Sequence, residues 1–247
     1  MTEQELQLQM PDGLADAVLF TPDLAAKLPG VLHLPDIGSV REAHRVMVRR
    51  LAAEGYAVLL PNIFYRTGRP PVFDFPRKMG EERTMKRVAE LIAPLTPEAQ
   101  RQDVAAYIDH LLAQPAVRPG MVGTVGYCFS GALSLRAAAT RPLQVAAAAS
   151  FHGGGLYKAD NEASPHLLLP RVKARLYFGH AVEDNSMNAE AIAEFNSALH
   201  LWEGKGESEV YAGAHHGWTV PDNPAFHPPQ AARAFDKLTE LFAAMLY

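Results

Sequence analysis

Short apolar runs alternate with longer amphipathic segments along most of this chain, and this alternation strongly limits how it can fold. Predicted strands cover residues 31–34, 56–60, 121–126, 145–151, 174–178 and 209–211. Predicted helices cover residues 40–54, a segment ending near 94, and residues 96–114, 131–140, 189–202 and 230–246. The strand segments are apolar throughout, which is typical of strands buried on both faces. The sequence therefore predicts an α/β fold, with a mostly parallel central sheet and helices on both faces.

Two predicted helices begin at recognisable start signals. Ser39 and Glu42 have the spacing of a capping box, and Thr96 precedes Pro97 and Glu98 as an N-cap residue would. Residues 62–79, rich in Pro, Arg and aromatic side chains, are predicted to form a long loop.

Composition excludes several classes of function. The chain has 247 residues and is expected to form a single domain spanning 1–247. A net charge of -4 gives no electrostatic reason to bind nucleic acid or an anionic membrane. One cysteine allows neither an intrachain disulfide nor a cysteine-based zinc cluster. Without a signal-peptide pattern or a membrane-length apolar run, we expect a cytoplasmic protein, either a monomer or a small homo-oligomer.

The segment from Thr124 to Gly131, Thr-Val-Gly-Tyr-Cys-Phe-Ser-Gly, joins a predicted strand directly to a predicted helix. A nucleophile on such a sharp turn needs small residues two positions before and two after it, and Gly126 and Ser130 meet that need around Cys128. The helix N-terminus favours a thiolate, and the Phe129 amide is free to bind an oxyanion. A lone cysteine is more often an inert core residue, and Ser130 is a rival nucleophile with a poorer elbow.

The candidate base and acid come later in the chain, as this type of site requires. His215 and His216 follow the last predicted strand, and we favour His216 because Gly217 comes next and leaves the ring room to move. Glu183 and Asp184 follow another strand and compete for the role of orienting acid, which we give to Asp184 although a turn role is equally common for such a residue. His152, His166 and His200 are otherwise read as histidines without a catalytic role.

With these segments in place, the sequence resembles the dienelactone hydrolase family (carboxymethylenebutenolidases) over roughly residues 8–246. The Gly-Tyr-Cys elbow is the most specific feature, since most α/β-hydrolases carry serine there. The resemblance implies an α/β-hydrolase fold with Cys128, Asp184 and His216 as the catalytic triad, and His216-Gly217-Trp218 matches the family's His-Gly-aromatic motif.

The resemblance also implies roles for an early loop, Leu34-Pro35-Asp36-Ile37-Gly38. The family's acid there, usually Glu, holds the resting thiol and helps to activate it, and here it is Asp36. The Ile37 amide would be the second oxyanion donor. Apart from the resemblance, the position of Asp36 at the end of an early strand places it opposite the elbow. Burial and a neighbouring thiolate are then expected to raise its pKa, unless Asp36 only caps the turn.

The family usually has Gly where this chain has Ser130, which is expected to tighten the elbow or add a hydroxyl to the site. Candidate substrate contacts are named without a specific match to the family's arginines. They are Tyr65, Arg66, Arg69, His152 and Trp218.

The predicted reaction is cysteine-dependent hydrolysis of a small-molecule lactone or enol ester, with no metal or organic cofactor. An enol leaving group suits a thiol nucleophile better than an alkoxide does. The alternatives are a general carboxylesterase for small activated esters and a non-enzymatic binding protein with a hydrolase fold.

Overall fold

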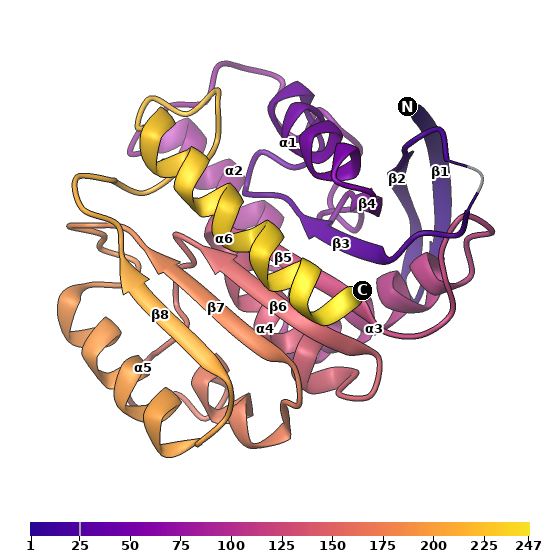
Figure 1. Ribbon diagram of the computed structural model, residues 1–247. Helices are drawn as coiled ribbons and strands as arrows, with labels where there is room; N and C mark the ends of the chain where they lie inside the picture. The colour runs from indigo at the N-terminus through magenta and orange to yellow at the C-terminus, as the bar shows by residue number, and fades with distance from the viewer. Residues whose placement is uncertain (25) are drawn as a thin grey trace.

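A computed structural model, which describes residues 1–24 and 26–247, shows one eight-stranded sheet with helices on both faces (Figure 1). The strands are β1 (Thr2–Met10), β2 (Gly13–Thr21), β3 (Gly30–Leu34), β4 (Ala57–Pro61), β5 (Val122–Tyr127), β6 (Val145–Phe151), β7 (Arg175–His180) and β8 (Gly206–Val210). The helices are α1 (Glu42–Ala53), α2 (Glu82–Ile92), α3 (Pro97–Leu112), α4 (Gly131–Thr140), α5 (Ala189–Leu201) and α6 (Pro228–Leu246), with 3₁₀ turns η1 (Cys128–Ser130) and η2 (Pro165–Arg171).

The strand order is β1-β2-β4-β3-β5-β6-β7-β8. β1 pairs with β2, and β2 with β4, in antiparallel fashion, and every other neighbouring pair is parallel. The predicted α/β architecture with a mostly parallel sheet is therefore confirmed.

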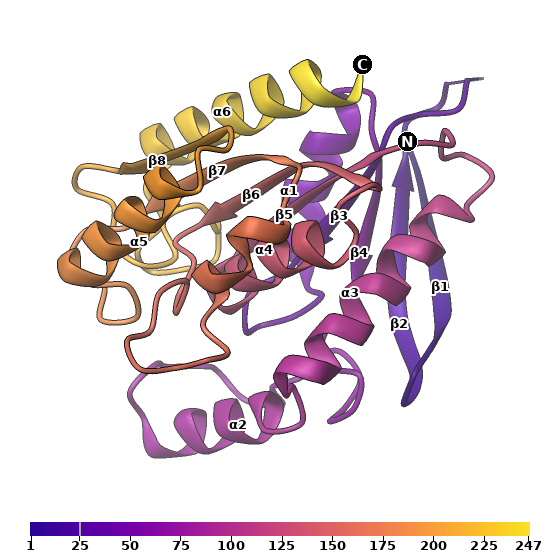
Figure 2. The same cartoon turned by 90° about the horizontal axis from the view of Figure 1, so that it is seen from below.

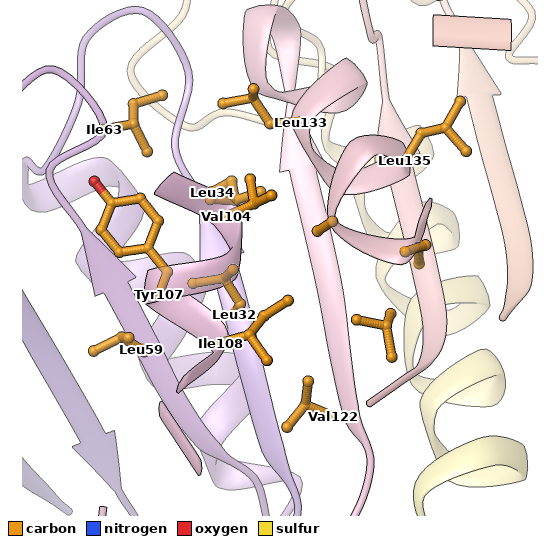
Figure 3. Close-up of a cluster of buried hydrophobic side chains, with 14 of the residues drawn as sticks. Leu32, Leu34, Leu59, Ile63, Val104, Tyr107, Ile108, Val122, Leu133 and Leu135 are labelled. Atoms are coloured by element: carbon orange, nitrogen blue, oxygen red, sulfur yellow. The ribbon is translucent and has the colours of Figure 1, made fainter. Parts of the chain in front are cut away.

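Two apolar layers hold the helices against the sheet. Helices α1 and α6 pack on one face, around Leu51 and Phe242, while α3, α4 and α5 pack on the other (Figure 2). Figure 3 shows the second layer where α3 meets β3: Tyr107 and Ile108 lie against Leu32. These side chains are at most 1% exposed, so the central strands are buried on both sides, as their continuous apolar runs require.

The N-terminal hairpin of β1 and β2 was not predicted from the sequence. Only the last part of β1 alternates in burial, with Leu8 and Met10 buried between exposed neighbours, because β1 lies at the sheet edge. Leu8 pairs with Ala15 and Met10 with Gly13 across the hairpin. A mostly polar edge strand gives little period-2 signal, and for that reason it escaped detection.

Of the two predicted helix starts, one is confirmed and one is wrong. The Thr96 hydroxyl caps α3 by accepting the amide of Ala99 at 3.1 Å. At α1 the N-cap is Arg41 with no side-chain cap, and the Ser39 hydroxyl instead donates to Asn62 Oδ1 at 3.0 Å. Ser39 therefore bonds to Asn62, a residue distant in the sequence, and does not cap the helix.

The strand order reverses between β3 and β5. From β3 the chain moves outward to β4 and then returns across β3 to form β5. Loops at the carboxyl ends of the two strands diverge there and leave a crevice, the usual place for a ligand in an open α/β sheet. Leu34 of β3 is paired with Gly126 of β5, so the segments after them, including Cys128, emerge side by side.

Candidate active site

Cys128 stands on a strained turn between β5 and α4. Its φ of 56° lies in the left-handed region, which is costly for a residue with a side chain. The turn is crowded, since a Cβ added to Gly126 would lie 2.0 Å from the carbonyl oxygen of Ser130. The only residue that fits at position 126 is therefore glycine, and the turn has the geometry of a nucleophile elbow.

Ser130, the rival nucleophile, is fully buried beneath the elbow. Its hydroxyl donates to the Leu34 carbonyl at 2.7 Å and accepts the amide of Tyr127 at 2.9 Å. These bonds fasten the elbow to the end of β3. Ser130 thus tightens the turn, and its hydroxyl is not directed into the cavity.

His216 and Asp184 form a hydrogen-bonded pair beside the cysteine. The Nδ1 atom of His216 lies 2.6 Å from Asp184 Oδ2, and the other carboxylate oxygen accepts the Ser186 amide at 2.8 Å and the Ser186 hydroxyl at 2.7 Å. With Nδ1 held by Asp184, Nε2 of His216 is the atom available to Cys128. The structure thus brings Cys128, Asp184 and His216 together.

The charges in this triad are coupled. Burial lowers the pKa of His216, but the hydrogen bonds with Asp184 and Cys128 outweigh burial and raise the pKa to about 10. Burial raises the pKa of Asp184, while the hydrogen bond with His216 lowers it, and the net pKa lies below its usual value. A protonated imidazole beside the Asp184 carboxylate is therefore the favoured state at neutral pH.

His215 and Glu183, the alternatives to His216 and Asp184, are more exposed to solvent. His215 has a side chain 57% exposed and lies 3.9 Å from Glu183. Asp184, by contrast, has a side chain only 5% exposed. His215 and Glu183 line the mouth of the same cavity but are poorly placed to orient His216.

His152 supports the backbone of Cys128 from beneath the elbow. Its Nδ1 accepts the backbone N–H of Cys128 at 3.1 Å, so its Nε2 carries the proton and donates to Thr219 Oγ1 at 2.7 Å. Burial, reinforced by the charge of His216, lowers the pKa of His152 well below its ordinary value and keeps the ring neutral. We predicted His152 as a substrate contact, but it is 1% exposed and lies beneath the site.

The two amides predicted to bind an oxyanion, those of Ile37 and Phe129, lie after β3 and β5 respectively. Neither amide has a hydrogen-bond partner among residues 1–24 and 26–247. Because the ends of β3 and β5 are paired, both amides are at the same crevice. Phe129 also lines the cavity.

Asp36 is bound to other groups than the thiol. Its carboxylate accepts both terminal nitrogens of Arg41, at 2.6 and 2.9 Å, and the amide of Gly38 at 2.8 Å. Burial raises its pKa, but the charges and hydrogen bonds of His44 and Arg41 lower it well below the usual value. The predicted rise in pKa is wrong because Arg41, a partner that no local sequence pattern indicates, binds the carboxylate and stabilises its charged form. Its carboxylate caps the turn at Gly38.

A cavity of about 1250 Å³ opens over Cys128. Helix α2 and the loop before it, with Met79 and Met85, contribute one wall of this cavity. Inside it lies Arg136 of α4, 8% exposed, whose Nε donates to Gln100 at 3.0 Å. Arg136 forms no ion pair with any residue that the structure describes. An unpaired, buried cation suits an anionic group on a substrate.

The other predicted substrate contacts lie away from this cavity. Tyr65 and Arg66 are bound to Asp103, and Arg69 is paired with Asp16. Trp218 is fully buried, stacked on Tyr211 with ring centroids 4.3 Å apart. The candidate cations predicted from the sequence, Arg66 and Arg69, are in the long loop, whereas the cation in the cavity is Arg136, which in the sequence looks like an ordinary helix residue.

The sheet order, the elbow and the order Cys128, Asp184, His216 along the chain define an α/β-hydrolase. The family model of the dienelactone hydrolase family matches residues 15–246. The chain belongs to this family, whose members are hydrolases.

Individual relatives agree with this assignment. A Synechocystis protein named "Putative carboxymethylenebutenolidase" is 27% identical, over 92% of this chain and 91% of its own. The carboxymethylenebutenolidase of Pseudomonas putida is 30% identical over 64% of each chain. A crystal structure of a "Putative Dienelactone Hydrolase" from Klebsiella pneumoniae superposes with a TM-score of 0.86 at 21% identity, covering 98% of both chains, and shows the shared fold.

Across residues 1–24 and 26–247, no group of three His, Cys, Asp or Glu side chains is placed to hold a metal ion. In the same part of the chain, none of the helices has the length and apolar character needed to cross a bilayer.

Proposed function

We propose that this protein is a cysteine-dependent hydrolase that opens a carboxylate-bearing lactone or enol ester. The observation that carries the proposal is the placement of the left-handed elbow residue Cys128 against the His216–Asp184 pair. The raised pKa of His216 means that the imidazolium is available to stabilise a thiolate before substrate arrives.

In the proposed reaction the Cys128 sulfur attacks the carbonyl carbon, and the carbonyl electrons move onto its oxygen. The amides of Ile37 and Phe129 stabilise that oxyanion. The carbon–oxygen bond to the leaving group then breaks, and the leaving oxygen takes the proton from His216. Water next gives a proton to the now neutral His216 and attacks the thioester carbon, which frees the acid and restores the thiolate.

Arg136 supports a substrate that carries a carboxylate. It is the buried cation of the cavity and has no acidic partner in the described chain, so a substrate anion would supply the missing charge. The preference for an enol over an alkyl leaving group follows from the nucleophile, because a thiolate is itself a good leaving group and returns from the tetrahedral intermediate when the other group leaves poorly.

The first experiment compares kcat/KM for a carboxylate-bearing dienelactone with that for p-nitrophenyl acetate. We expect the dienelactone to be favoured, and Arg136→Gln to reduce its kcat/KM about 10- to 100-fold with little change for the uncharged ester. A general carboxylesterase would instead favour the activated ester and lose both activities equally, or neither, in Arg136→Gln.

The nucleophile is tested by a matched pair of variants. Cys128→Ala should abolish hydrolysis, and Ser130→Ala should keep it, with a loss of thermal stability because the bond to the Leu34 carbonyl is gone. Appreciable turnover by Cys128→Ala would contradict a cysteine nucleophile. If the wild-type protein shows no turnover and its Cys128 resists iodoacetamide, a non-catalytic binding protein is favoured.

A further inference from the structure

Two buried histidines connect the loop that carries the Ile37 amide to helix α1. His33 of β3 and His44 of α1 are at most 1% exposed, and the Nε2 atom of His33 lies 2.9 Å from the Nδ1 atom of His44. The Nε2 atom of His44 accepts the backbone N–H of Asp36 at 3.1 Å. Both rings lie outside the triad and outside the lining of the cavity above Cys128, so the proposed reaction gives them no role.

The hydrogen bonds fix the tautomer of both rings. A backbone N–H can only donate, so the Nε2 atom of His44 carries the lone pair and its Nδ1 atom carries the proton. That proton is donated to the Nε2 atom of His33, which places the single ring proton of His33 on Nδ1. Burial lowers the pKa of both histidines, and that of His33 well below its ordinary value, so both rings are neutral. His44 is therefore held as an acceptor toward Asp36.

This arrangement leaves one donor unsatisfied. The Nδ1 atom of His33 is buried and has no hydrogen-bond partner in the part of the chain that the structure describes. Unsatisfied buried N–H groups are uncommon because they destabilise the folded state. Two apolar side chains of similar size would fill the same space without that cost. Packing alone therefore does not explain the pair, and what His44 adds to packing is an acceptor for the Asp36 N–H.

The Asp36 N–H adjoins the peptide unit that carries the oxyanion donor. The Asp36 carbonyl accepts the Ser39 N–H at 2.9 Å, which closes a β-turn. In a trans peptide the carbonyl and the N–H point in opposite directions, so the Ile37 N–H points away from the inside of this turn. Its direction in the crevice then depends on how the whole turn is held, and the first residue of the turn is held by His44.

We propose that His44 is a positioning residue for the oxyanion site, because it accepts the Asp36 N–H and so fixes the direction of the Ile37 N–H. His33 keeps the His44 ring in the accepting tautomer. Both rings also pack against Tyr127, directly before the elbow, with centroids 4.9 and 5.7 Å from its ring centroid. This inference rests on the proposed function, since the Ile37 amide has a catalytic use only if an oxyanion forms.

The test is a matched pair of variants that differ by one methylene group. The side-chain oxygen of His44→Gln reaches the position of Nε2 and can accept the Asp36 N–H, whereas that of His44→Asn reaches only the position of Nδ1. The rate constant for acylation of Cys128 by p-nitrophenyl acetate is measured in a single turnover. We expect His44→Asn to lower it about 10- to 100-fold, and His44→Gln to stay within about threefold of the wild type.

Alkylation of Cys128 by iodoacetamide is the control reaction, because attack on a saturated carbon forms no oxyanion. Its rate should stay within about twofold of the wild type in both His44 variants, whereas a displaced elbow would change acylation and alkylation together. The Asp36 amide proton should exchange with solvent faster in His44→Asn than in His44→Gln, as followed by NMR. His180→Asn, which replaces a buried histidine bonded to Ser208 on β8, is the control for lost packing and should leave the acylation rate unchanged.

Equal acylation rates in His44→Asn and His44→Gln would overturn the proposal, whether both match the wild type or both are slow. A parallel change in acylation and alkylation would also overturn it. If His44→Asn does not fold, His33→Leu gives the second test, and acylation slowed about three- to tenfold with unchanged alkylation supports the role, while unchanged acylation contradicts it. A wild-type protein whose Cys128 is not acylated would overturn the proposed function, and this role with it, whereas the outcomes above overturn this role alone.

Discussion

The Nδ1 atom of His152 accepts the backbone N–H of Cys128 at 3.1 Å, and this bond helps to hold the cysteine in its left-handed conformation. A side chain thereby replaces a backbone partner at the most strained point of the elbow. Because His152 is buried and neutral, it is a positioning residue and not a base.

We therefore expect His152→Phe to lower kcat about 10- to 100-fold with little change in KM, since a small displacement of a nucleophile has effects of this size. The measurement is steady-state kinetics together with the rate of alkylation of Cys128, the chain's single cysteine, by iodoacetamide. Thr219→Val should give a smaller loss in the same direction, because it removes only the partner of Nε2. His200→Phe, at an exposed position on α5, is the control, and an unchanged kcat in His152→Phe would contradict the positioning role.

The sequence was sufficient to predict most of the architecture and the residues that approach one another at the site. Apolar strands and the small residues around Cys128 are local signals, and the order of nucleophile, acid and base is fixed along the chain. The supports of the site were harder to find. His152 and Arg136 acquire their positions only when β6 lies beside β5 and when α4 packs against α3. Neither has a local motif.

The long-range charge pairs explain the remaining errors. Arg66 and Arg69 looked available for a substrate in the sequence, but they meet Asp103 and Asp16 from other elements. Asp36 looked like a free acid and meets Arg41. In each case the partner is set by tertiary folding, or by a turn whose geometry the sequence did not specify.

The pKa of His216 leads to a second prediction. A pKa of about 10 keeps the imidazole protonated across the neutral range, and the paired state is lost as the pH rises through that value. We expect kcat/KM to fall above about pH 10 and the His216 ring protons to titrate there by NMR. Asp184→Asn removes a charge that raises this pKa, so both midpoints should move to lower pH, and activity should fall by several orders of magnitude. A midpoint near the ordinary histidine value in the wild type would contradict the coupling.

A third prediction separates the adjacent histidines. His216→Ala should lose at least 10³-fold in kcat, because the group that transfers the proton is gone. His215→Ala should stay within about threefold of the wild type, since its exposed ring is 3.9 Å from Glu183 and orients nothing in the site. The two variants are compared on the same substrate, with thermal melting as the check on folding. Equal losses, or the reverse ranking, would refute the choice of His216.

The last prediction concerns Asp36, whose two possible roles are distinguished by different measurements. If Asp36 serves the turn and the ion pair with Arg41, Asp36→Asn keeps the hydrogen bond from Gly38 but loses the charge. We expect a loss of about 2 kcal/mol of unfolding free energy at neutral pH, and a fall in kcat/KM of less than about tenfold.

The pH dependence of that loss gives the sharper test. The folded pKa of Asp36 is held well below 3.8, so its stabilising contribution is present above this value and is lost as the pH falls below it. The stability difference between wild type and Asp36→Asn should therefore shrink on acidification, as followed by urea unfolding between neutral pH and about pH 3. An acid that exchanges a proton with the thiol predicts the opposite pattern. Asp36→Asn would then retain wild-type stability, and kcat/KM would collapse across the whole pH range.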